Sequence, residues 1–115
     1  MAPLLACGTK WLGSVRFAQR AAAARDYKLQ SQVREAARSG PRNIAEGFAR
    51  YRHREFARFV RIAKASEVEL LNHFEEAFNC DYLTNGERCD LDRAAKKAIK
   101  AANGLIRYLE STPDA

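Results

Sequence analysis

Residues that interrupt helices or cross-link a chain are scarce in this sequence. Its 115 residues include only six glycines, three prolines, three cysteines and one tryptophan. Ala, Arg, Glu, Leu and Lys dominate instead, and few residues favour strands, so the composition argues against a sheet and indicates an all-α fold. At this length we expect one domain, residues 1–115, with a modest hydrophobic core.

Long hydrophobic runs and a signal peptide are also lacking. No apolar run approaches the ~20 residues of a membrane-spanning helix, so we expect no membrane partner. Residues 4–8 resemble a lipoprotein cleavage box, but the six residues before Cys7 include no basic residue and leave no room for an apolar segment. Cys7, Cys80 and Cys89 are odd in number and lack metal-binding spacing. We therefore expect reduced thiols in a cytoplasmic protein.

The residue combinations that mark enzyme active sites are missing as well. His53 and His73 are far apart in sequence, and the chain has no Glu-x-x-His motif, no glycine-rich phosphate loop and no recognisable nucleophile. A group of carboxylates lies on one predicted helix: Glu67, Glu69, Glu75 and Glu76. Without histidine partners we interpret this group as an acidic surface. We expect no catalytic residue, metal, cofactor or small-molecule substrate, and an enzyme is the least favoured class.

The spacing of apolar residues predicts four helices, at about residues 5–24, 27–50, 53–80 and 85–110. Short connections favour an antiparallel up-down-up-down four-helix bundle. Asp26 is expected to cap the second helix, and Thr84 with Glu87 to form a capping box for the fourth. The third helix has no such residue at its start, and Pro113 predicts a short disordered tail.

The second predicted helix has an apolar face that keeps its phase through a proline. At 100° per residue, this face collects Leu29, Val33, Ala36, Ala37, Gly40, Ile44, Gly47, Phe48 and Tyr51. An interior proline costs ~3 kcal/mol, because it removes the hydrogen bond to the carbonyl four residues earlier, here that of Ala37. We therefore predict one continuous helix, kinked at Pro41, in which Gln32, Ser39 or Asn43 satisfies that carbonyl.

The third predicted helix has a face rich in phenylalanine. The residues expected to be buried there are Phe56, Phe59, Val60, Ala63, Leu70, Leu71, Phe74, Ala77 and Phe78. Each of the four phenylalanines is expected to contribute ~1.5–3 kcal/mol of burial. Glu67 falls near the middle of this face, so it must find a partner or lie where the bundle opens.

A polar stripe borders the apolar face of the second helix. It includes Gln32, Asn43, Glu46 and Arg50, of which Glu46 and Arg50 have the spacing of a helical ion pair. We interpret this stripe as a structural polar network between helices rather than as a catalytic group, because paired buried charges are usually architectural.

Positive charge is concentrated in the N-terminal half. Residues 1–64 hold 14 Lys and Arg against 4 Asp and Glu, a net charge of +10, whereas residues 65–115 hold 6 against 10, a net charge of −4. This division favours a polyanionic partner or head-to-tail contact between subunits. An unevenly charged, solvated surface explains it equally well.

Arginines account for most of the positive charge in the second and third helices. The candidate nucleic-acid-binding residues are a row on the outer face, Arg34, Arg38 and Arg42, and a group at the helix corner, Arg50, Arg52, Arg54, Arg58 and Arg61. Like charges four residues apart cost ~0.2–0.5 kcal/mol per pair, so we expect an anion to neutralise them. Arginine suits bidentate phosphate contacts. Because Tyr51 is the one aromatic residue expected near this group, we predict contacts to the RNA backbone rather than to bases.

Two consecutive segments resemble the signature of a bacterial four-helix-bundle family: SQVREAARSGPRNIAEGFAR and EFARFVRIAKAS. Its members include proteins encoded in intervening sequences of 23S ribosomal RNA genes and the accessory variability determinant of diversity-generating retroelements. The matching residues are Ser31, Gln32, Arg34, Ala37, Ser39, Pro41, Asn43, Ile44, Ala45, Glu46, Gly47, Arg50, Glu55, Phe56, Arg58, Phe59, Ile62, Ala63, Ser66, Glu69 and Leu70. The resemblance covers roughly residues 27–110, and Glu67 departs from it.

The resemblance implies a continuous kinked second helix, a homopentameric ring, and ribosomal RNA or a reverse-transcriptase complex as the setting. With the arginines, it predicts a non-enzymatic protein that binds RNA or an RNA–protein complex through the arginine-rich outer faces of a ring-shaped homo-oligomer. The alternative is a scaffold that binds an acidic protein partner.

Overall fold

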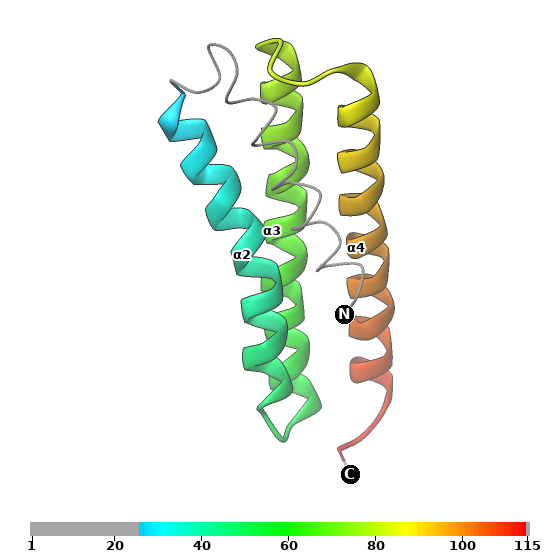
Figure 1. The fold of residues 1–115 in the computed structure, drawn as a ribbon. Coiled ribbons are helices and arrows are strands. Elements are labelled where there is room, and N and C mark those ends of the chain that lie inside the picture. Colours follow the sequence, from blue (N-terminus) through cyan, green and yellow to red (C-terminus); the bar gives the residue numbers. More distant parts are fainter. Residues whose placement is uncertain (1–25, 115) are drawn as a thin grey trace.

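The computed structural model describes residues 26–114, which form an all-helical structure. Within this range the helices are α2 (Tyr27–Phe48), α3 (His53–Asn79) and α4 (Asn85–Ser111). The chain reverses direction at each connection, so that α3 lies beside α2 and α4 lies beside α3 (Figure 1). The helix expected at residues 5–24 lies outside the described residues, so the four-helix bundle stays a prediction.

Local sequence signals place the start of α2 where it was expected. The carboxylate oxygen Oδ1 of Asp26 accepts a hydrogen bond from the amide of Leu29 at 3.1 Å. The helix then continues through Pro41 and ends at Phe48, two residues before the expected end. The side-chain amide of Asn43 was a candidate donor to the carbonyl of Ala37, which Pro41 leaves without its regular partner. It donates instead to the carbonyl of Ser39, at 2.8 Å. The kink at Pro41 stays a prediction.

The start of α4 carries the expected capping box. Thr84 Oγ1 accepts from the amide of Glu87 at 3.1 Å, and the amide of Thr84 donates to Glu87 Oε1 at 2.9 Å. This reciprocal pair satisfies two amide groups that have no partner inside the helix. The box fixes where the chain turns from α3 into α4.

The start of α3 is capped from a distant part of the chain. Arg52 precedes the helix, and its side chain makes no capping hydrogen bond. The amide of His53 instead donates to Asp114 Oδ1 at 2.7 Å. The prediction of a disordered tail after Pro113 was therefore wrong, since these residues pack against α3.

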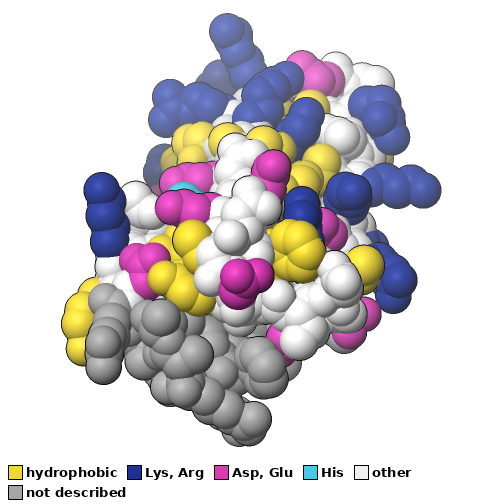
Figure 2. Space-filling view, turned by 90° about the horizontal axis from the view of Figure 1, so that it is seen from above, with side chains coloured by type: hydrophobic (Ala, Val, Ile, Leu, Met, Phe, Trp, Pro, Cys, Tyr) yellow, Lys and Arg dark blue, Asp and Glu magenta, His cyan; other side chains and the backbone are white. Residues whose placement is uncertain are grey.

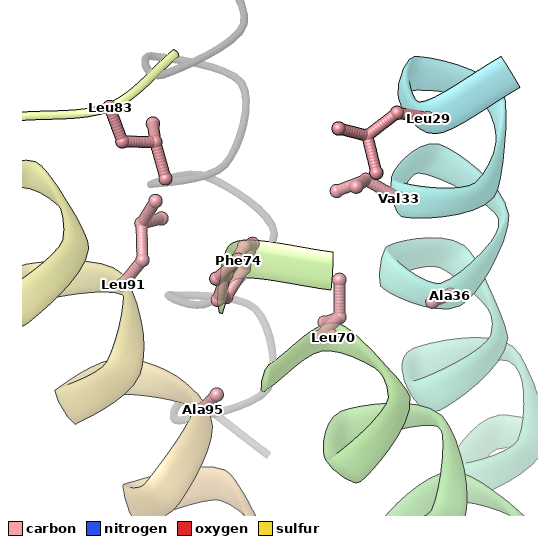
Figure 3. Packing of buried hydrophobic residues seen from close by; sticks show 8 residues of the cluster. All are labelled: Leu29, Val33, Ala36, Leu70, Phe74, Leu83, Leu91 and Ala95. Carbon is pink, nitrogen blue, oxygen red and sulfur yellow. The ribbon is translucent and has the colours of Figure 1, made fainter. Parts of the chain in front are cut away.

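The core forms two clusters along α3. The first contains Leu29, Val33, Ala36, Leu70, Phe74, Leu83, Leu91 and Ala95, and Phe74 lies between the side chains from α2 and those from the α4 side (Figure 3). The second contains Ile44, Ala57, Val60, Ala63, Ala98, Ala102, Ile106 and Leu109. Alanines dominate where α3 and α4 meet in the second cluster, which allows their backbones to approach closely.

On α3, burial differs from the expectation for three phenylalanines and decides between the two alternatives for Glu67. Of the four phenylalanines assigned to the core, Phe74 is buried, whereas Phe56, Phe59 and Phe78 are only partly buried. Periodicity assigned the correct face but not the depth of each side chain. Glu67 is 1% exposed, which excludes the alternative that it lies where the bundle opens to solvent.

Candidate nucleic-acid interface

The connection between α2 and α3 gathers five of the eight candidate arginines into one concave surface. A depression of about 590 Å³, here called the arginine depression, is lined by Arg50, Arg52, Arg54, Glu55, Arg58, Phe59 and Arg61. It lies at the lower end of the molecule in Figure 1, where the chain turns from α2 into α3. Among the described residues that line it, Glu55 is the one carboxylate. Five guanidinium groups and one carboxylate give the lining of the depression a net positive charge.

The Phe59 ring is close to two of these guanidinium groups. Arg50 Cζ is 5.1 Å from the centre of the Phe59 ring, and Arg58 Cζ is 5.6 Å from it. Cation–π contacts at these distances restrict both side chains without using their N–H donors. The ring therefore holds two arginines in place while leaving donors free for an anion.

Two arginines of the depression form surface ion pairs. Arg50 Nη2 lies 2.9 Å from Glu46 Oε1, and Arg61 pairs with Glu110. Exposed pairs of this kind are worth ~0–1 kcal/mol, so they do not prevent binding of an anion. The remaining three, Arg52, Arg54 and Arg58, form no ion pair with another residue in the described part of the chain.

The row predicted on the outer face of α2 is a separate group. Arg34, Arg38 and Arg42 are all exposed, and none of them lines the arginine depression. Arg42 pairs with Glu35 at 3.0 Å, whereas the other two have no ion-pair partner within residues 26–114. The eight candidate arginines therefore form two groups: three in a row on α2 and five around the arginine depression.

Aromatic residues at the corner were underestimated from the sequence. Phe48 is 76% exposed and Tyr51 is 98% exposed, although periodicity assigned both to the buried face. The assignment was wrong for Tyr51 because α2 ends at Phe48, so that helical spacing no longer applies. Phe48 is the last residue of the helix, and its ring contacts Phe56 at one edge but is otherwise exposed. With Phe59 in the depression, three aromatic residues accompany the arginines instead of one.

The sequence pattern that defines the 23S rRNA-intervening sequence proteins matches residues 13–104. The chain belongs to this family. No curated protein is similar enough to the chain to count as a match. The likeness to the accessory variability determinant, which the resemblance also includes, stays a prediction.

In this family member the polar residues of α2 do not form the single network that was predicted. Glu46 and Arg50 pair with each other on the exposed surface of α2, and Gln32 is also exposed. These three side chains therefore do not link the helices. The spacing of Glu46 and Arg50 correctly predicts their ion pair, but it does not show that the pair lies away from the contact between α2 and α3.

Ser39 and Ser66 make a polar contact between α2 and α3, and Asn43 lies against Ser39. Asn43 Nδ2 lies 3.1 Å from Ser39 Oγ, and Ser66 Oγ donates to Ser39 Oγ at 2.7 Å. Ser66 is 6% exposed, so the hydroxyl contact is largely removed from water. This short link holds α2 and α3 in register near the middle of the helices.

The end of this intervening-sequence protein opposite the arginine depression has mixed character. Figure 2 shows Lys and Arg side chains mostly at the upper and right edges of the view, with Asp, Glu and hydrophobic side chains nearer the middle. At this end the Tyr82 hydroxyl donates to Asp26 Oδ2 at 3.1 Å. Burial, followed by the adjacent carboxylate, raises the pKa of Tyr82 above its ordinary value.

Other chemistry is limited within residues 26–114. No group of three or more His, Cys, Asp or Glu side chains in this range is placed to hold a metal ion. The carboxylates predicted to form one acidic surface separate, because Glu67 is buried while Glu69, Glu75 and Glu76 are exposed. Cys80 and Cys89 are exposed free thiols, and Cys7 lies outside the described residues. None of α2, α3 and α4 is long and apolar enough to span a membrane.

Proposed function

We propose that this protein binds RNA, or an RNA–protein complex, and catalyses no reaction. The arginine depression carries this proposal, because it concentrates five guanidinium groups around one carboxylate. A guanidinium group donates two parallel hydrogen bonds to a phosphate, which suits a surface built from arginine rather than lysine. The family description refers to 23S rRNA, which supports RNA as the polyanion.

Binding through phosphates makes the affinity depend on salt. Each neutralised phosphate releases condensed counterions, so the logarithm of the binding constant falls with the logarithm of salt concentration by roughly 0.7–0.9 per phosphate. Arg52, Arg54 and Arg58 lack ion-pair partners among the described residues and are the first candidates for these contacts. Arg34 and Arg38 on α2 extend the positive surface beyond the depression.

We also propose that the subunit is an antiparallel four-helix bundle, kinked at Pro41, and that it assembles into a homopentameric ring. The division between a basic and an acidic half supports head-to-tail contact. Ile62 and Val68 on α3 are 41% and 42% exposed, which leaves apolar surface for a neighbouring subunit. A ring would repeat the arginine depression around its circumference. An acidic protein partner is the second candidate ligand, because a strongly positive surface attracts carboxylates as well as phosphates.

Size exclusion with light scattering, with and without a structured RNA, tests both proposals. We expect a particle of about 65 kDa, which is five chains of 12.9 kDa, and a shift with RNA at low salt only. A 12.9 kDa monomer that ignores RNA would contradict the ring and the RNA proposal together. A particle that ignores RNA but binds polyglutamate would favour the acidic protein partner.

A further inference from the structure

We infer that the corner between α2 and α3 binds unpaired nucleotides, with bases stacked on Phe48 and Tyr51 and phosphates held by the arginine depression. This inference rests on the proposed RNA binding and narrows its ligand to single-stranded segments. It replaces the sequence-based expectation of contacts to the RNA backbone alone.

The first observation is the exposure of the two rings. Tyr51, at 98%, and Phe48, at 76%, are the most exposed of the large hydrophobic residues within residues 26–114. They alternate along the chain with Arg50 and Arg52, both of which line the arginine depression. Bases stack on aromatic faces in proteins that bind single strands, and nearby positive charge follows the backbone. The corner supplies both components within five consecutive residues.

The second observation is that one ring is already held in place. Phe48 packs edge to face with Phe56, with ring centres 6.1 Å apart and an angle of 81° between the planes. Phe56 in turn packs against the second core cluster. A base that stacks on Phe48 would therefore meet a ring whose motion is restricted before binding, which lowers the entropic cost of association.

The third observation is the close packing that joins the rings to the phosphate donors. A side chain at Gly47 would place its Cβ 2.7 Å from Phe59 Cβ and 2.7 Å from Phe56 Cδ1, so the end of α2 lies directly against α3. This approach puts Phe48 beside Phe56 and lets Arg50 reach across the Phe59 ring. Phe48 and Arg50 are thus held at the same packed corner, and Tyr51 follows Arg50 directly in the chain.

A double helix cannot use both features at once. Its base faces are already stacked inside the helix, and its phosphates lie on a stiff convex surface that does not enter a depression of about 590 Å³. A flexible single strand bends into the concave surface and presents its bases to the exposed rings. We therefore assign loops, bulges or free ends of RNA, rather than duplex, to this corner.

Fluorescence anisotropy with three labelled ligands of equal phosphate number tests the inference: a single-stranded RNA, the same strand without bases, and a short RNA duplex. Tyr51→Leu and Phe48→Leu remove a ring but keep apolar bulk. Each is expected to weaken single-strand binding roughly 5- to 100-fold and to leave the baseless strand and the duplex unchanged. The control is Tyr27→Leu, which removes a ring that is 75% exposed at the other end of α2.

Two outcomes overturn the inference while leaving phosphate binding intact: unchanged single-strand affinity in Tyr51→Leu, or equal affinity of wild type for the intact and the baseless strand. Failure of all three RNA ligands to bind would contradict the proposed function itself. Circular dichroism checks the fold of each variant. Because Tyr51 lies in the connection and is almost fully exposed, Tyr51→Leu gives a decisive result even if Phe48→Leu does not fold.

Discussion

The backbone amide of His53 donates a hydrogen bond to Oδ1 of Asp114, 2.7 Å away, across 61 positions of the chain. This contact ties the start of α3 to the tail that follows α4. The first amide groups of a helix have no partner within it, and Arg52 supplies no capping oxygen. Asp114 therefore caps α3 from the far end of the sequence, and its negative charge is favourable beside a helix N-terminus.

Replacing Asp114 with alanine is expected to lower the free energy of unfolding by about 0.5–2 kcal/mol, the usual effect of losing an N-cap. Urea denaturation followed by circular dichroism measures the change. Asp90→Ala is the control, because Asp90 is exposed and lies 3.7 Å from Arg93 in a surface ion pair. The control is expected to change stability by less than about 0.5 kcal/mol. Equal losses in the two variants would contradict a capping role for Asp114.

Two glycines are expected to respond oppositely to the same substitution. At Gly47 an added Cβ would lie 2.7 Å from Phe59 Cβ, so Gly47→Ala forces α2 and α3 apart and costs about 1–3 kcal/mol. At Gly104 the nearest atom would be Arg107 Nη2 at 3.9 Å, so Gly104→Ala gains helix propensity of about 0.5–1 kcal/mol. Thermal unfolding distinguishes the two signs. A stabilising Gly47→Ala would mean that the helices do not approach this closely.

Tyr82 gives the stability a dependence on alkaline pH. Its pKa is raised by burial and by the hydrogen bond to Asp26, so the folded chain holds the phenolic proton more tightly than the unfolded chain. This contribution to stability is complete below the unfolded tyrosine pKa of about 10 and is lost as pH rises through the folded pKa.

Comparison of wild type with Tyr82→Phe between roughly pH 8 and pH 11 isolates this contribution, because the other titrating groups are common to both proteins. The advantage in unfolding free energy that wild type gains from Tyr82 is expected to stay constant up to about pH 10 and then to fall. Tyr27→Phe, which alters a side chain that is 75% exposed, is the control. If the difference in unfolding free energy between wild type and Tyr82→Phe did not change with pH, the pKa of Tyr82 would not be raised in the folded chain.

The helix bounds could be predicted because the signals that set them are local. Asp26 and the pair of Thr84 and Glu87 act within three residues of the helices they start, and the bounds within residues 26–114 differ from the expected ones by at most two residues. The cap of α3 could not be found in this way. Asp114 is distant in sequence, and no local pattern links it to His53.

The gathering of arginines at the α2–α3 corner could be predicted from the sequence, but the exposure of the aromatic residues there could not. Five arginines surround one short connection, so sequence proximity alone indicates that they gather. Phe59 was assigned to the core, yet its ring contacts Arg50 and Arg58. Helical periodicity indicates which face of a helix a residue lies on, but not that the residue is near the end of the helix, where neighbouring side chains are polar. Phe48 and Tyr51 are exposed at and just beyond the end of α2, whereas the apolar pattern predicts a helix that continues past both residues.

The proposed location of RNA binding is tested most directly by two charge reversals of equal size. One variant replaces Arg52, Arg54 and Arg58 with glutamate, and the other replaces Lys96, Lys97 and Lys100, which are exposed on α4, with glutamate. Both shift the net charge by the same amount, and circular dichroism checks that both remain helical.

Binding of a single-stranded RNA at moderate salt is the measurement. The arginine variant is expected to lose affinity on the order of 100-fold and to show a shallower dependence on salt, whereas the lysine variant stays within a few-fold of wild type. An equal loss in the two variants would contradict a site at the α2–α3 corner and would leave only a response to overall charge.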